Sequence, residues 1–136
     1  MKILAIDYGK KRVGLAVGDT ETKLALPYGV LSGRSSEILL EQLQKIILEE
    51  DIGTIVLGEP FNVSGANSQQ TDTSRAFAQF LQGNISVPVV LFDERFTSQR
   101  ADTAKNMVEG SKTRSRDELA AMFLLQDYLE KVDLKS

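Results

Sequence analysis

A chain of 136 residues, with a hydrophobic fraction of 42% and a charged fraction of 26%, has the size and composition of one ordinary globular domain. It contains neither cysteine nor histidine, which excludes disulfides, thiolate metal sites and histidine acid–base catalysis. The net charge of −3 does not by itself indicate a nucleic-acid partner.

The opening of the chain predicts an antiparallel meander of three strands. Short apolar runs at 2–7, 13–17 and 24–31 are separated by polar, glycine-containing turns, which is typical of hairpins. Pro27 cannot donate a backbone hydrogen bond, so the third strand is expected at an edge of the sheet.

The remainder of the chain alternates helices with strands. Ser35 and Ser36 offer an N-cap for the first helix, which is expected to end before Gly53, and Ser115 with Glu118 forms a capping box for the last helix. The elements expected in this part are a strand at 54–58, a long polar loop at 59–70, a helix at 71–82, a strand at 87–92, a short helix at 97–108 and a final helix after 115.

This order predicts an α/β fold with a mixed five-stranded sheet, in which an antiparallel three-strand meander is joined by parallel strands and flanked by helices. A single domain over residues 1–136 accommodates all of it. The first residues lack the pattern of a signal peptide, and no apolar run approaches the roughly 20 residues of a membrane helix. We therefore expect a cytoplasmic protein.

Acidic residues recur where strands end and where the last helix begins. Asp7 and Glu59 follow apolar strands, Asp93 and Glu94 follow another, and Asp117 lies in the first turn of the last helix. Each alone could be a turn or strand-end acid in solvent, and an acid at a helix start is common. Together they would meet at one end of the sheet, where they could hold two Mg²⁺ or Mn²⁺ ions.

Two glycines and several basic groups accompany these acids. Gly9 permits a tight turn, and Gly14, which is unfavourable inside a strand, indicates close approach of a ligand backbone. Basic side chains gather despite the acidic balance of the chain, and such local patches suit phosphate. They fall at Lys10, Lys11 and Arg12, at Arg95 and Arg100, and at Lys112, Arg114 and Arg116.

A series of stretches that spans nearly the whole chain carries a family resemblance. In order they are Ile6-Asp7-Tyr8-Gly9-Lys10-Lys11-Arg12-Val13-Gly14-Leu15-Ala16, Gly58-Glu59-Pro60-Phe61-Asn62-Val63-Ser64-Gly65, Phe92-Asp93-Glu94-Arg95-Phe96-Thr97-Ser98, and Asp117-Glu118-Leu119-Ala120-Ala121 with Leu125-Gln126-Asp127-Tyr128-Leu129. The chain resembles the YqgF (RuvX) family of pre-16S rRNA nucleases, also described as Holliday-junction resolvases.

The resemblance implies a ribonuclease H-like fold and a metal-dependent hydrolase of the two-metal-ion type. The activity it implies is cleavage of nucleic-acid phosphodiesters, in 5′-end processing of pre-16S rRNA. It implies a metal site of Asp7, Asp117 and one acid of the pair Asp93 and Glu94, of which Glu94 is favoured. It also implies that Lys11, Arg12 and Arg95 face nucleic acid. Glu59 replaces an apolar residue of the family pattern, and we expect it in the metal site or at its edge.

Other functions remain open from the sequence. Branched DNA is an alternative substrate, and resolution of a junction would favour a homodimer over a monomer. A non-catalytic nucleic-acid-binding module with the same fold is a second alternative. An ATP-dependent phosphotransferase is disfavoured, because those enzymes bind ATP between two such domains and this chain has room for one.

Overall fold

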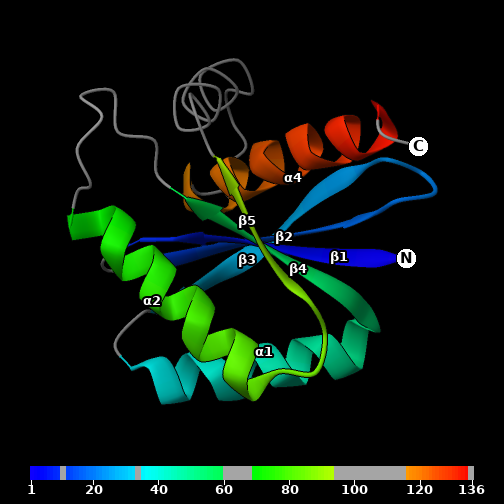
Figure 1. Cartoon of the computed structure of the whole chain (residues 1–136). Coiled ribbons are helices and arrows are strands. Elements are labelled where there is room, and N and C mark those ends of the chain that lie inside the picture. The colour runs from blue at the N-terminus through cyan, green and yellow to red at the C-terminus, as the bar shows by residue number, and fades with distance from the viewer. Residues whose placement is uncertain (10–11, 33–34, 60–68, 94–115, 135–136) are drawn as a thin grey trace.

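The computed structural model describes residues 1–9, 12–32, 35–59, 69–93 and 116–134, and these form a mixed sheet between two layers of helices (Figure 1). The five strands lie in the order β3-β2-β1-β4-β5. The expected fold class is confirmed. The bounds are β1 Lys2–Tyr8, β2 Arg12–Asp19, β3 Ala25–Ser32, α1 Ser36–Glu50, β4 Ile52–Glu59, α2 Gln69–Asn84, β5 Val89–Asp93 and α4 Arg116–Leu134.

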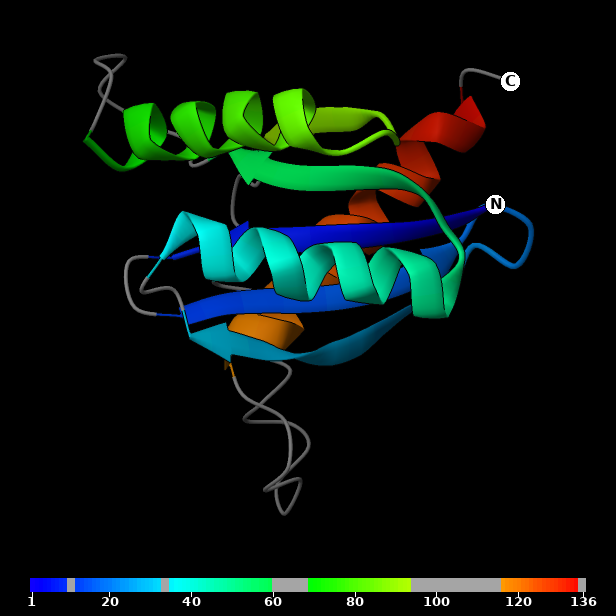
Figure 2. The ribbon, with the colours of Figure 1, turned by 90° about the horizontal axis from the view of Figure 1, so that it is seen from below.

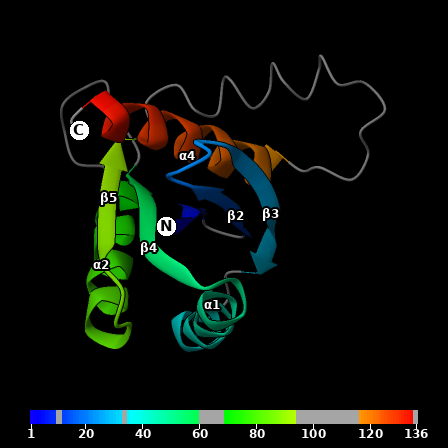
Figure 3. The same cartoon turned by 90° about the vertical axis from the view of Figure 1, so that its right-hand side faces the viewer.

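The first three strands form the expected antiparallel meander. β1 pairs with β2 and β2 pairs with β3, while β1, β4 and β5 run parallel. The end-on view in Figure 3 shows β3 and β5 at opposite edges of the sheet. Pro27 therefore lies on an edge strand, as its missing N–H predicts.

Local capping explains the limits of α1. The hydroxyl of Ser35 accepts a hydrogen bond from the backbone N–H of Ile38 at 3.4 Å, as expected for an N-cap. The helix ends before Gly53, as expected, and the left-handed residue that ends it is Asp51, with φ of 55°. The short side chain of an aspartate tolerates this conformation better than most.

The two faces of the sheet carry separate hydrophobic clusters. Leu4 and Ile6 of β1 pack with residues of α1 and α2, whereas Ile3 and Ala5 pack with α4. Figure 2 shows α1 and α2 in front of the sheet on its first face. Because side chains alternate along a strand, β1 holds both layers together.

Two of the expected elements lie largely or wholly in segments that the structure does not describe. The short helix at 97–108 and most of the loop at 59–70 lie outside the described residues. In the part of the chain that is described, no helix is long and apolar enough to cross a membrane.

Candidate metal and nucleic-acid site

The carboxyl ends of β1, β4 and β5 lie side by side. Ile6 pairs with Leu57, so Asp7 stands one residue further, level with Gly58. On the next strand pair, Glu59 is the partner of Asp93. The backbones of three of the expected acids therefore reach the same edge of the sheet, which is where open α/β sheets bind ligands.

Asp117 lies near this edge because its backbone packs against a glycine of β2. The Cα partner of Asp7 across the hairpin is Gly14, and Gly14 contacts the backbone carbonyl of Asp117 at the start of α4. A Cβ atom at Gly14 would overlap that carbonyl and lie 3.0 Å from the backbone nitrogen of Glu118. Gly14 thus admits the backbone of a helix, which corrects the expectation that it admits a ligand.

Asp7 and Asp117 share one face of the sheet. Ile3 and Ala5 pack against α4, and Asp7 follows them at the same alternating position of β1. Asp7 is half-buried, and the side chain of Asp117 is 32% exposed. Figure 1 shows the first turn of α4 and the carboxyl end of β1 on the side of the molecule away from the N-terminus.

A tight turn places Arg12 beside the same site. The backbone N–H of Gly9 donates to the carbonyl of Arg12 at 3.0 Å, and a Cβ at Gly9 would lie 2.6 Å from that oxygen. Nη1 of Arg12 is 3.8 Å from Oδ2 of Asp117. No local sequence pattern predicts this pair, because its members lie in elements that are far apart along the chain.

The opposite face of the strand end is held by aromatic packing. Tyr8, the neighbour of Asp7, stacks on Phe77 of α2 with ring centroids 4.2 Å apart and planes inclined by 10°. Phe77 in turn lies 6.4 Å from the ring of Phe80. The backbone of Asp7 is therefore held by the pairing of β1 with β2 and by the packing of the adjacent Tyr8 in the core.

The other candidate residues of the site lie at or beyond the limits of the described segments. Glu94, Lys11, Arg95, Lys112 and Arg114 lie outside the described residues, and Glu59, Asp93 and Arg116 are described in their backbone alone. Among the described side chains no group of three or more acids forms a metal cluster. Asp7 and Asp117, whose backbones both lie beside Gly14, carry the hard oxygen donors that Mg²⁺ and Mn²⁺ prefer.

Sequence reasoning missed a stripe of small residues that brings α4 onto the sheet. Gly14, Ala16 and Gly18 alternate along β2 on the face that α4 covers, and a Cβ at Gly18 would lie 2.9 Å from Leu125 of that helix. The spacing of small residues at every second position was the signal that could have revealed it.

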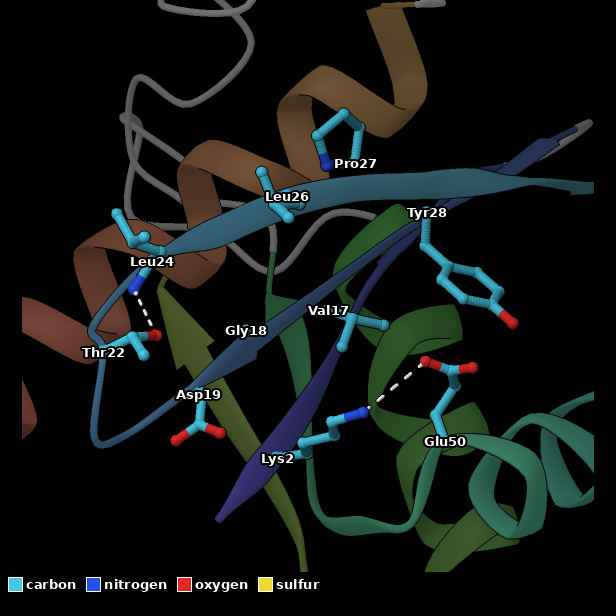
Figure 4. A pocket seen from close by; sticks show the side chains of 10 residues that line it. All are labelled: Lys2, Val17, Gly18, Asp19, Thr22, Leu24, Leu26, Pro27, Tyr28 and Glu50. Carbon is cyan, nitrogen blue, oxygen red and sulfur yellow. Dashed lines mark hydrogen bonds and ion pairs between the residues drawn. The ribbon is translucent and has the colours of Figure 1, made fainter.

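A pocket of about 360 Å³ lies at the other end of the sheet (Figure 4). Its lining is mostly apolar and includes Leu24, Leu26 and Tyr28 of the β3 region. Lys2 and Glu50 form an ion pair of 3.8 Å at its border. Burial, together with the charges of Glu50 and Glu49, raises the pKa of Tyr28 above its ordinary value. This pocket is separate from the edge where Asp7 and Asp117 meet.

Known proteins match the chain over nearly all of its length. Residues 1–131 match the model of the RuvX family, described as a Holliday junction resolvase. A relative from Koribacter versatilis (strain Ellin345), named "Putative pre-16S rRNA nuclease", is 38% identical over 133 residues, covering 96% of this chain and 87% of the relative. One of the same name from Maridesulfovibrio salexigens is 33% identical over 132 residues, covering 95% and 98%.

Solved structures resemble the fold at much lower identity. Thermus thermophilus RuvC in complex with a Holliday junction substrate has a TM-score of 0.67 at 14% identity, covering 98% of this chain and 96% of that one. The Fowlpox virus resolvase with its Holliday junction DNA has a TM-score of 0.62 at 13% identity, covering 97% and 99%. These likenesses establish the ribonuclease H-like fold.

Proposed function

Because the chain belongs to the RuvX family, we propose that it is a metal-dependent nuclease that hydrolyses phosphodiester bonds in the processing of pre-16S rRNA. The observation that carries the proposal is that the backbones of Asp7 and Asp117 both lie beside Gly14, at the carboxyl edge of the sheet. A strand and a helix that are distant in sequence there place two aspartates on one face of the sheet. Such a processing activity would be exercised in the cytoplasm.

The proposed metal ligands are Asp7, Glu94 and Asp117. Phe92 of β5 packs in the cluster on the α4 face, shortly before the acidic pair of Asp93 and Glu94 in the sequence. Of the acidic pair we prefer Glu94 to Asp93, as the resemblance to the family implies. Asp93 and Glu59, which end adjacent strands, belong to the edge of the proposed site.

The carboxylates have the chemistry that this reaction requires. Two bound Mg²⁺ or Mn²⁺ ions would supply Lewis acidity at the scissile phosphate and a nucleophile at neutral pH. Asp7 is held by the β1–β2 pairing and by the anchor of Tyr8, so its oxygen atoms need little reordering to bind a cation. Asp117 is positioned by the backbone contact of α4 with Gly14.

Basic side chains would hold the nucleic-acid backbone beside these acids. Arg12 is 67% exposed and already lies next to Asp117, so its guanidinium can reach a phosphate at the site. Contacts of this kind give affinity without reading sequence. The other proposed contacts are Lys11, Arg95, Lys112, Arg114 and Arg116.

Cleavage assays with matched variants test this function. The purified protein would be incubated with a labelled pre-16S rRNA fragment or a four-way DNA junction, each with Mg²⁺, Mn²⁺ or EDTA. We expect metal-dependent cleavage of the RNA, abolished in Asp7→Asn, because the substitution removes a metal-binding carboxylate while the strand stays paired. Asp19→Asn is the matched control, since Asp19 is another strand-end aspartate, paired across the hairpin with Lys2 at the far end of β1.

The two substrates separate the competing functions. Cleavage of the junction alone would favour a resolvase, which the description of the RuvX family also suggests. Wild-type rates in Asp7→Asn would remove Asp7 from the mechanism. Binding of RNA without cleavage, in a folded protein that takes up no metal, would favour the non-catalytic module.

A further inference from the structure

One ion pair joins two residues that, in the proposed function, must each bind a ligand instead of one another. Arg12 lies 3.8 Å from Asp117 through Nη1 and Oδ2. The proposed function needs Asp117 to bind a divalent cation and Arg12 to bind a phosphate. A carboxylate oxygen that coordinates Mg²⁺ at about 2.0–2.1 Å gives most of its negative charge to the metal, so it attracts a guanidinium only weakly. The metal ion and the guanidinium also repel each other.

The pair is weak enough to be exchanged. The side chain of Arg12 is 67% exposed and that of Asp117 is 32% exposed, so water screens the attraction. The backbone of Arg12 is fixed by the Gly9 turn, whereas its long side chain can turn about several bonds. A divalent cation can therefore displace the guanidinium without unfolding any element.

We propose that Arg12 is an exchangeable counter-ion, which neutralises Asp117 in the metal-free protein and turns to a substrate phosphate when a divalent cation binds Asp117. This inference rests on the proposed function. It makes the binding of metal and the binding of nucleic acid mutually favourable, because each ligand releases a group that the other needs. By linkage, each must then raise the affinity of the other by the same factor.

Titration with Mn²⁺ in the absence of nucleic acid tests the first half of the exchange. We expect Arg12→Gln to bind Mn²⁺ about two- to five-fold more tightly than wild type, because an exposed ion pair competes by no more than that. Arg12→Lys, which keeps the charge, should stay close to wild type. An unchanged affinity in Arg12→Gln would overturn the exchange.

Lys2→Gln is the matched control for this titration. Lys2 forms an ion pair with Glu50 at 3.8 Å, the same separation as in the pair of Arg12 with Asp117. Like Arg12→Gln, the Lys2→Gln substitution removes one positive charge. Lys2 lies about 16 Å from Asp7 along the same strand, which exceeds the roughly 8 Å Debye length at 0.15 M salt. Its Mn²⁺ affinity should equal that of wild type, and an equal tightening would assign the effect to net charge alone and overturn the exchange.

Binding of a labelled RNA hairpin tests the second half. It would be measured in EDTA and in Ca²⁺, with the RNA checked for integrity, over a range of salt concentrations. We expect Arg12→Gln to weaken binding in Ca²⁺, with a salt slope lower by about 0.7–0.9, and to change little in EDTA, where Arg12 is held by Asp117. Equal weakening in both conditions would show that Arg12 contacts phosphate without the metal, and would overturn the exchange.

The outcomes separate this inference from the function on which it rests. A folded wild-type protein with no affinity for Mn²⁺ would overturn the metal site and the proposed nuclease together. Mn²⁺ binding that is lost in Asp7→Asn but indifferent to Arg12→Gln would leave the nuclease standing and overturn the role of Arg12 alone.

Discussion

Gly14 is the residue at which strand and helix backbones touch, and the geometry of the acids depends on it. A methyl group there would overlap the carbonyl of Asp117. We expect Gly14→Ala to lower the free energy of unfolding by about 1–3 kcal/mol, as overpacking does, and to weaken Mn²⁺ binding by displacing Asp117. Urea denaturation and Mn²⁺ titration would measure the two effects.

Gly83 gives the matched control for that substitution. It lies in α2, and nothing stands within 4 Å of where its Cβ would be. Gly83→Ala should stabilise the protein by about 0.5–1 kcal/mol, because alanine favours a helix over glycine, and should leave Mn²⁺ affinity unchanged. If Gly14→Ala were as harmless as Gly83→Ala, the close approach of α4 would not position the site.

The residue scale also marks what the sequence can and cannot predict of the site. Asp7 could be identified because a carboxylate directly after a buried apolar run needs an explanation. Asp117 gave a weaker signal, since acids are common in the first turn of helices. The pair of Arg12 with Asp117 could not be predicted, because it depends on the packing of α4 against β2 and not on any local pattern.

At the scale of elements, the sequence predicts that α1 ends before Gly53, but it does not predict which residue caps that end. Alternation and apolar runs locate strands, but the residue that ends a helix is decided by one left-handed conformation. Asp51 adopts it with φ of 55°, and its backbone N–H bonds to the carbonyl of Ile47. The predicted limit of the helix, before Gly53, is correct, and Gly53 itself lies inside β4.

Asp51→Gly is therefore expected to stabilise the protein. Glycine adopts the left-handed region without the steric cost of a Cβ, which is about 1 kcal/mol for other residues. The thermal midpoint should rise, with α1 unchanged by far-UV circular dichroism. Asp51→Ala serves as the comparison, because alanine keeps the Cβ, and a similar gain from it would attribute the effect to charge.

At the scale of the molecule, the candidate site is built on β1, a strand that packs with both layers of the fold, so its assembly requires the two layers to fold together. Leu4 and Ile6 belong to the α1–α2 cluster, while Ile3 and Ala5 of the same strand belong to the α4 cluster. Loss of either layer would expose a face of β1. We therefore expect one cooperative unfolding transition, in which Asp7 and Asp117 separate only when the whole domain unfolds.

Tyrosine fluorescence can test this cooperativity, because the chain has three tyrosines and no tryptophan. Tyr8 packs with the α1–α2 cluster and Tyr128 with the α4 cluster, so variants that retain one or the other report on one layer each. Their urea midpoints should coincide. Leu43→Ala or Leu124→Ala, each in a different layer, should lower the stability seen by both probes by about 2–5 kcal/mol. An earlier transition at Tyr128 alone would mean that α4 detaches first, and that the site can be dismantled while the rest of the sheet stays folded.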